Sequence, residues 1–228
     1  MFLIENRINM RFVFVVLSLI CFTYLNAQVS DVDGNTYQTV IIGDQNWMAE
    51  NLKTTRYATG DTIPNVINKE KWLNLTDGAW SYYKNDEKFN EVYGKLYNWY
   101  NVIDERNVCP NGWHVPSDAE WKILADFIIS NGHEGREGLA LKSINGLNTF
   151  DGLSGNGTDD YGFHALPGGN RNINGNFSNL GKNGYWWSTS EHANPVNAWS
   201  RYLYSNNRNI MNYEDFKNYG FSIRCLQD

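Results

Sequence analysis

The stretch Cys-Pro-Asn-Gly-Trp-His-Val-Pro-Ser-Asp-Ala-Glu-Trp at residues 109–121 decides the fold. Its Pro-Asn-Gly segment predicts a turn, and the next three residues predict a short strand, because Pro116 disfavours helical geometry at Val115. Ser117 and Glu120 have the spacing of a capping box, so a helix should begin there. Its apolar face repeats at helical spacing, at Trp121, Leu124, Ala125 and Ile128. We therefore expect a turn, a strand and a helix start in one piece, anchored by Cys109.

The N-terminus has the pattern of an export signal. Residues 12–22 form an apolar run with two arginines before it, and the small residue Ala27 predicts cleavage before Gln28. The run is too short for a comfortable membrane span. We expect a signal peptide at residues 1–27 and a secreted, periplasmic or cell-surface product.

Residues 28–228 show no internal repeat, low-complexity linker or block of charge. We therefore expect a single domain, with no transmembrane segment once the signal is removed. Lipidation of Cys21 is the alternative to its removal. Lipoprotein signals prefer Gly, Ala or Ser before the cysteine, whereas Leu19-Ile20 precedes it here, which favours removal.

Cys109 and Cys225 are the two cysteines that cleavage would leave. An even pair in an exported protein predicts a disulfide, which would join the middle of the chain to its C-terminal end. The alternative is a reactive thiol, but neither cysteine belongs to a Cys-x-x-Cys pair.

The composition excludes several classes of protein. With 42% hydrophobic and 19% charged residues, the chain is neither disordered nor membrane-embedded. Its net charge of −6 offers no broad basic surface for nucleic acid or anionic lipid. The 15% aromatic content suits either a sugar-binding surface or a core poor in long helices, and the core is the better interpretation.

Hydrophobic periodicity and turn signals divide the rest of the chain into short elements. Strands are expected at residues 37–42, 46–52, 79–83, 161–166, 184–190, 198–204 and 220–225. Helices are expected at residues 66–76, 94–105 and 118–130. Residues 132–180 are dense in Gly and Asn, and a loop of that length is usually functional or carries its own packing.

Five segments stand out as sequence motifs. They are residues 33–52 (Asp-Gly-Asn to Glu-Asn-Leu), 93–100 (Tyr-Gly-Lys-Leu-Tyr-Asn-Trp-Tyr), 109–121, 184–189 (Gly-Tyr-Trp-Trp-Ser-Thr) and 222–225 (Ser-Ile-Arg-Cys). In this order they resemble the signature of the Fibrobacter succinogenes major paralogous domain family, which occurs in exported proteins of Bacteroidetes and Fibrobacter relatives. The resemblance extends over residues 29–228.

A second, looser resemblance concerns the fold. Val-Pro-Ser-Asp-Ala-Glu-Trp at residues 115–121 is similar to a block of formylglycine-generating enzymes, and Gly-Phe-Ser-Ile-Arg at 220–224 is similar to their terminal Gly-Phe-Arg. Those enzymes have a C-type-lectin-like fold. The resemblance implies an α+β, C-type-lectin-like protein, with two helices flanking a small twisted antiparallel sheet and long loops that carry variable function.

Motifs of known catalytic and metal sites are missing from the sequence. An oxidase of the formylglycine-generating kind needs reactive cysteines late in the domain, and Cys225, the only late one, is expected in the disulfide. The four histidines have no metal-ligand spacing, and no Gly-x-Ser-x-Gly is present. We therefore expect no catalytic residue, no metal and no cofactor, and hence no enzyme.

Two segments distantly resemble calcium-binding sequences. Asp31-x-Asp33-Gly34-Asn35 has the start of a calcium loop without its terminal glutamate in register, and a plain turn is the better interpretation. Residues 191–197 lie where calcium-dependent lectins carry Glu-Pro-Asn. Here the proline is flanked by Asn and Val, and no Trp-Asn-Asp follows.

The leading hypothesis is calcium-independent binding by the second half of the chain. Aromatic faces stack on sugar rings, while Asn and Arg offer planar hydrogen-bond donors. The candidate ligand-binding residues are Asn170, Arg171, Trp187, Glu191, Asn194, Asn197, Trp199 and Arg201. Trp186 and Trp187 are neighbours on a predicted strand and face opposite sides, so one of them should belong to the core.

The expected function is that of a non-enzymatic binding module outside the cell, with a glycan or another envelope protein as its partner. The alternative is a structural or assembly protein of the cell envelope that works through protein–protein contacts. An enzyme of unrecognised type is the third hypothesis.

Overall fold

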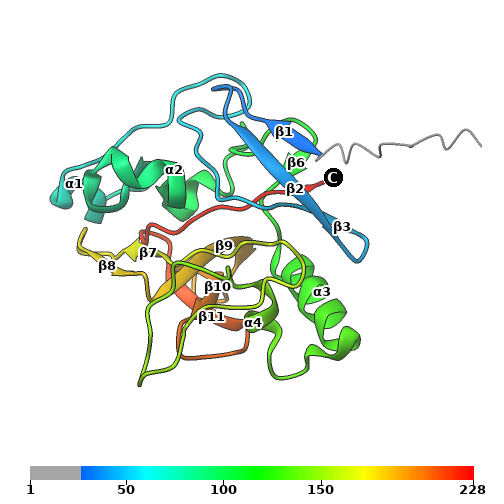
Figure 1. Ribbon diagram of the computed structural model, residues 1–228. Coiled ribbons are helices and arrows are strands. Elements are labelled where there is room, and N and C mark those ends of the chain that lie inside the picture. Colours follow the sequence, from blue (N-terminus) through cyan, green and yellow to red (C-terminus); the bar gives the residue numbers. More distant parts are fainter. Residues whose placement is uncertain (1–26) are drawn as a thin grey trace, which may run out of the picture.

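The computed structural model describes residues 27–228 (Figure 1). Of the predicted signal peptide, residues 1–26, including Cys21, therefore lie outside the described residues. The strands are β1 (Gln28–Ser30), β2 (Thr36–Ile42), β3 (Gln45–Met48), β4 (Trp80–Ser81), β5 (Leu96–Tyr97), β6 (Trp113–His114), β7 (Gly168–Arg171), β8 (Phe177–Leu180), β9 (Asn183–Glu191), β10 (Asn197–Tyr204), β11 (Met211–Phe216) and β12 (Leu226–Gln227).

The helices are short. They are α1 (Lys69–Leu73), α2 (Asn90–Tyr93), α3 (Asp118–Ile128) and α4 (Glu137–Leu141), with 3₁₀ turns at Tyr83–Asn85, Glu87–Phe89 and Trp99–Asn101 and a π turn at Ile129–His133. Within residues 27–228, no helix has the length and apolar character needed to cross a membrane.

A five-stranded antiparallel sheet holds both ends of the described chain. Its strand order is β1-β2-β3-β12-β6, so the C-terminal strand lies between two strands from the first half of the chain. Leu226 pairs with Trp47 on one side and with His114 on the other. Figure 1 shows the red C-terminal segment running into this sheet. The two halves of the sequence are therefore joined by main-chain hydrogen bonds.

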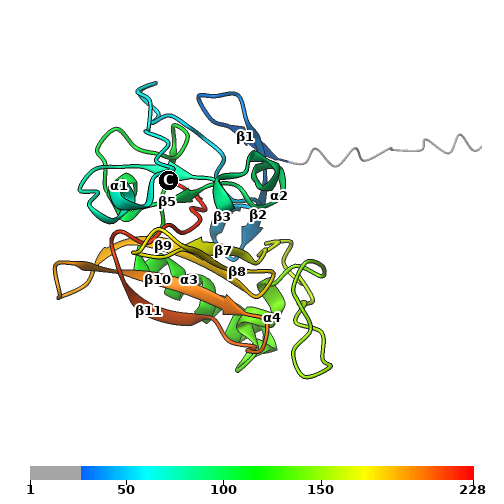
Figure 2. The same ribbon diagram turned by 90° about the vertical axis from the view of Figure 1, so that its left-hand side faces the viewer.

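The second sheet consists of β11, β10 and β9 in that order, all antiparallel. Ser200 of the central strand pairs with Trp187 and Tyr213. Figure 2 shows these strands side by side with α3 behind them. Two-stranded ribbons, β4-β5 and β7-β8, complete the pattern. The molecule is thus a mixed α+β protein with antiparallel sheets, as expected.

The stretch at residues 109–121 folds as predicted. It contains β6, then the capping box of α3, in which Ser117 Oγ accepts from the Glu120 N–H (3.3 Å) and Glu120 Oε2 accepts from the Ser117 N–H (2.7 Å). Cys109 forms the predicted disulfide with Cys225, with their Cα atoms 6.0 Å apart. The disulfide and β12 together fix the start of α3 against the C-terminal segment.

Two hydrophobic clusters meet at β9. Trp187 is fully buried in the first cluster, which joins the two sheets around Tyr37, Tyr97 and Phe221. Its neighbour Trp186 is buried in the second cluster, beneath α3 and α4. Adjacent strand residues face opposite sides, and both sides of β9 are covered, so both tryptophans belong to the core.

The helix expected at residues 94–105 is wrong. Gly94 ends α2 with a positive φ of 70°, and Leu96–Tyr97 instead pairs with β4. Asn98 then uses its side chain to accept from the Ala79 N–H (3.0 Å), which holds the chain in an extended arrangement before a single 3₁₀ turn. Tertiary hydrogen bonds override the apolar spacing that suggested a helix.

Two further expectations need correction. Residues 161–166 do not form a regular strand, because Gly162 and His164 both have positive φ, and only Ala165 makes a β-bridge, to Lys142. Residues 220–225 make isolated bridges, and regular pairing begins only at Leu226.

The long loop at residues 132–180 contains the elements α4, β7 and β8. The edge strand β11 was not predicted from the sequence.

Candidate functional site

Four of the eight predicted ligand-binding residues are buried, which corrects their predicted role. Arg171 has no exposed surface, and its guanidinium donates to the backbone carbonyls of Val66, Ile67 and Gly175 while lying 4.1 Å from the centre of the Trp72 ring. Burial lowers its pKa to about 10. Trp187 is also fully buried and donates through Nε1 to the Tyr97 carbonyl (2.8 Å). Neither side chain can reach a ligand in solution.

Asn170 and Arg201 are likewise satisfied inside the protein. Asn170 Oδ1 accepts from Ser178 Oγ (2.5 Å) across the β7–β8 ribbon. Arg201 is 5% exposed and forms an ion pair with Asp118 at the start of α3 (2.5 Å). These residues hold secondary-structure elements together and offer almost no surface to a ligand.

The other four predicted residues, Glu191, Asn194, Asn197 and Trp199, come together at the turn between β9 and β10. Trp199 is half-buried and packs against the His192 ring, with centroids 5.0 Å apart. Lys217 contacts Glu191, donates to the Pro195 carbonyl (2.6 Å) and lies 4.5 Å from the centre of the Trp99 ring. Glu191 and the Pro195 carbonyl therefore already bind another residue of the protein.

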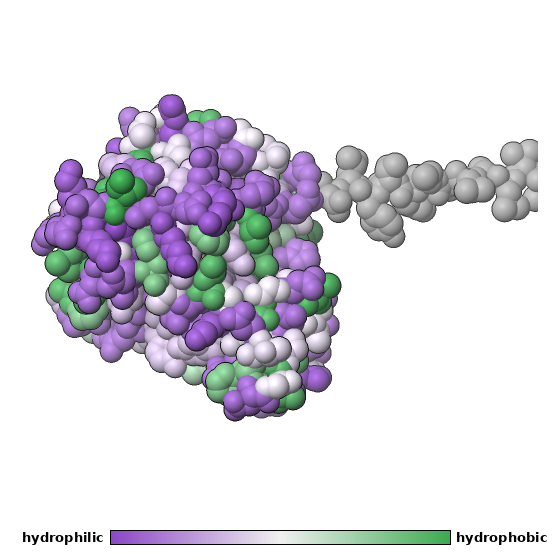
Figure 3. All heavy atoms as spheres, turned by 60° about the vertical axis from the view of Figure 1, so that its left-hand side comes forward, coloured by the Kyte–Doolittle hydropathy of each residue, from purple (hydrophilic) through white to green (hydrophobic). Residues whose placement is uncertain are grey.

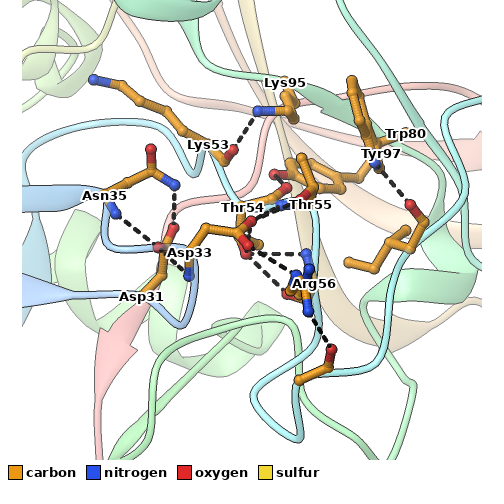
Figure 4. A network of polar contacts seen from close by, with 12 residues as sticks. Asp31, Asp33, Asn35, Lys53, Thr54, Thr55, Arg56, Trp80, Lys95 and Tyr97 are labelled. Atoms are coloured by element: carbon orange, nitrogen blue, oxygen red, sulfur yellow. Dashed lines mark hydrogen bonds and ion pairs between the residues drawn. The ribbon is translucent and has the colours of Figure 1, made fainter.

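The aspartates of the turn after β1 form hydrogen bonds within the turn and to residues 55–56 (Figure 4). Asp31 accepts from the Asp33 and Asn35 N–H groups (3.0 and 2.9 Å). Asp33 accepts from the Thr55 N–H (2.6 Å) and pairs with Arg56 (3.2 Å). Burial alone would raise the pKa of Asp33, but these contacts hold it below 3.8. Both carboxylates thus have protein partners, and the segment forms a turn.

The surface is hollowed where the long loop meets the β10–β11 turn. Two adjoining depressions, of about 510 and 290 Å³, share Phe150, Ser205, Asn206 and Asn207; we call them together the loop hollow. Its remaining lining residues are Leu139, Lys142, Asn148, Thr149, Leu153, Ser154, Lys182, Asn183, Tyr204 and Arg208. This is the candidate functional site.

The hollow is built on backbone contacts that fix the loop. The Asn148 N–H donates to the Gly181 carbonyl (2.6 Å), and Phe150 and Leu153 exchange two hydrogen bonds (2.8 and 2.9 Å). Gly155 is required by close approach, because a Cβ there would lie 2.6 Å from Ser205 Cβ and 2.4 Å from the Asn148 carbonyl oxygen. The loop is thus held against the end of β10.

The lining combines apolar faces with amide groups. Phe150 is 49% exposed and Leu153 is 74% exposed, while Tyr204 is half-buried. Asn148, Asn183, Asn206 and Asn207 supply carboxamides. Figure 3 shows one face of the molecule, where hydrophobic residues occur in small groups among hydrophilic ones. In the described part of the chain, no three His, Cys, Asp or Glu side chains form a metal-binding group.

One histidine–carboxylate pair has a geometry familiar from hydrolases. The carboxylate of Asp159 contacts His164 Nδ1 and accepts from the His164 N–H (2.8 Å). Both residues have positive φ, which is uncommon outside glycine. Among the described residues, no hydroxyl group hydrogen-bonds to the His164 ring, so the arrangement lacks the nucleophile of a triad.

A family model, the Fibrobacter succinogenes major domain, matches residues 40–227. The chain belongs to this family. The match confirms the resemblance drawn from the five sequence motifs, and the loop hollow lies wholly within the matched part of this Fibrobacter succinogenes major domain. No curated protein and no solved structure is similar enough to be matched.

None of the eight predicted ligand-binding residues lines the loop hollow. Two signals in the sequence pointed to it nevertheless. One is the Gly- and Asn-rich composition of residues 132–180, and the other is the polar Asn206-Asn207-Arg208 turn. The two segments are far apart in sequence, so their meeting could be found only from the fold.

Proposed function

We propose that this protein is an exported binding module of C-type-lectin-like fold that holds an oligosaccharide in the loop hollow and carries out no reaction on it. The observation that carries the proposal is the exposed pair Phe150 and Leu153 beside the carboxamides of Asn206 and Asn207. The hollow accommodates a few sugar rings rather than a large apolar molecule.

Sugar chemistry matches this lining. A pyranose ring has an apolar C–H face, which packs on aromatic and aliphatic side chains, and a rim of hydroxyl groups. Each carboxamide has both a donor and an acceptor, so one Asn can bind two neighbouring hydroxyls. A held loop also reduces the conformational entropy lost on binding.

Two observations support the fold and export parts of the proposal. The C-terminal strand lies between β3 and β6, so that both ends of the domain meet in one sheet, which suits a lectin-like layout. The Cys109–Cys225 disulfide suits an oxidising compartment, because cytosolic thiols are kept reduced.

Phe150→Ala tests the sugar-binding role. We expect the mature chain to bind oligosaccharides on a glycan array, and the variant to lose affinity about tenfold, or about 1.4 kcal/mol, in calorimetric titration, because truncation removes the stacking surface. Phe216→Ala is the matched control, since Phe216 is 46% exposed and lies outside the hollow. Equal affinities for the two variants, or no bound glycan, would refute the proposal.

A protein-binding role in the envelope is the second candidate. Its support is the exposed pair Val196 and Phe216, held together by the Lys217 N–H donating to the Val196 carbonyl (3.0 Å). Here the same two variants have reversed roles: Phe216→Ala should abolish capture of an envelope protein, while Phe150→Ala should leave it intact.

A further inference from the structure

The charged residues of the loop hollow are all basic. Lys142, Lys182 and Arg208 line it, and among the described residues no Asp or Glu does so. This departs from the whole chain, which has 25 acidic and 19 basic residues. Asp151 lies in the loop between Phe150 and Leu153 but is not part of the lining. The hollow is therefore a local positive region on an acidic protein.

Lys142 is a buried cation at the edge of the hollow. Its side chain is 2% exposed, and Nζ donates to the carbonyls of Tyr204 (3.1 Å) and Asn207 (3.0 Å). An ammonium group has three donors, so one is left by these two contacts. Burial, and then the nearby charge of Arg208, lower its pKa to about 8. Lys142 therefore adds positive charge at the edge of the hollow without being exposed to a ligand.

Lys182 and Arg208 are exposed on the rim of the hollow. Their backbones are fixed, because the Ser205 N–H donates to the Lys182 carbonyl (2.8 Å) and the Leu139 N–H donates to the Arg208 carbonyl (2.9 Å). Within residues 27–228, neither side chain forms a salt bridge to a carboxylate. Both cations are free to bind a ligand.

We propose that the ligand of the loop hollow is an acidic oligosaccharide, whose carboxylate or sulfate groups pair with the exposed Lys182 and Arg208 while its rings pack on Phe150. This assignment rests on the proposed function and narrows it to anionic sugars. A guanidinium binds carboxylate and sulfate in bidentate fashion, and the amides of the hollow are left to bind the hydroxyl groups.

Calorimetric titration with four probes tests the assignment. They are a uronic-acid tetrasaccharide, a sulfated tetrasaccharide, a neutral tetrasaccharide and inorganic polyphosphate. We expect at least one acidic sugar to bind about tenfold more tightly than the neutral one, and that preference to weaken as NaCl rises from about 50 to about 500 mM. The first two probes distinguish carboxylate from sulfate as the recognised group.

The double variant Lys182→Gln/Arg208→Gln should reduce the ratio of acidic to neutral affinity about tenfold. Lys71→Gln/Lys122→Gln is the control, because it removes the same charge from exposed helical positions outside the hollow and should preserve the ratio. Equal binding of neutral and acidic sugars would overturn the assignment but leave the proposed function intact. Binding of no sugar would overturn both. Polyphosphate binding as tightly as the acidic sugars would show that the site recognises charge alone, and would also overturn the assignment.

Discussion

His114 lies between two carboxylates at the junction of β6, α3 and the C-terminal strand. Its Nδ1 is 2.6 Å from Asp228 Oδ1, and its Nε2 is 2.9 Å from Glu120 Oε1. Burial by itself lowers the pKa of His114, but the hydrogen bonds and charges of Asp228 and Glu120 outweigh it and raise the pKa above 6.5. The histidine thus connects a helix cap to the last strand, and both carboxylates favour its protonated form.

His114→Gln should make stability less dependent on pH. Because the folded pKa is raised, the imidazolium contributes stability below pH 6.5, and that contribution disappears as the pH rises through the folded value. The free energy of unfolding lost by the variant should be about 0.5 to 1 kcal/mol larger at about pH 5.5 than at about pH 9, given the half-exposed pair. Urea denaturation of both proteins at the two pH values measures these losses. An equal loss at about pH 5.5 and about pH 9 would contradict the prediction.

At the scale of single residues, local chemistry was predictable and distant partners were not. The contact between Ser117 and Glu120 spans three residues and is encoded in their spacing. Arg171 instead finds its carbonyl partner Val66 at a separation of 105 residues. Arg and Trp are types that bind sugars and also types that fill cores, so residue type alone could not assign them.

The helix α3 depends on its capping box. Ser117→Ala removes the side-chain acceptor of the Glu120 N–H and should reduce the free energy of unfolding by about 1 kcal/mol. Ser130→Ala is the control, since Ser130 is exposed after the helix and donates only to the Phe127 carbonyl (2.8 Å). Urea denaturation should show a loss for the first variant alone, and equal stability of the two would argue against the cap.

Among the elements, those with strong local signals were predictable: β2, α3, β9 and β10 lie where periodicity placed them. The helix predicted at residues 94–105 is wrong because Leu96 and Tyr97 pair with β4, which lies before two 3₁₀ turns and α2. The ribbon β7–β8 was missed because Gly168 and Gly169 give little strand signal. The loop hollow depends on that ribbon's connection to β9, so its position was not readable from the sequence.

For the whole molecule, the disulfide and β12 tie the C-terminal segment to the first half of the chain. The bond joins residues 116 positions apart, and the chain-entropy model gives an upper stabilisation of about 4–5 kcal/mol for such a loop. The double variant Cys109→Ser/Cys225→Ser should therefore unfold at a markedly lower urea concentration. The denatured mature protein should contain no titratable thiol before reduction and two after it; two thiols before reduction would refute the disulfide.

The central claim is that an oligosaccharide occupies the loop hollow. The most direct measurement is an amide NMR titration of the mature protein with the acidic tetrasaccharide that binds most tightly. The claim predicts shifts concentrated at residues 148–154, 182–183 and 204–208, including the side-chain amides of Asn206 and Asn207. Shifts confined to the β9–β10 turn at residues 191–199, or no shifts at saturating sugar, would contradict it.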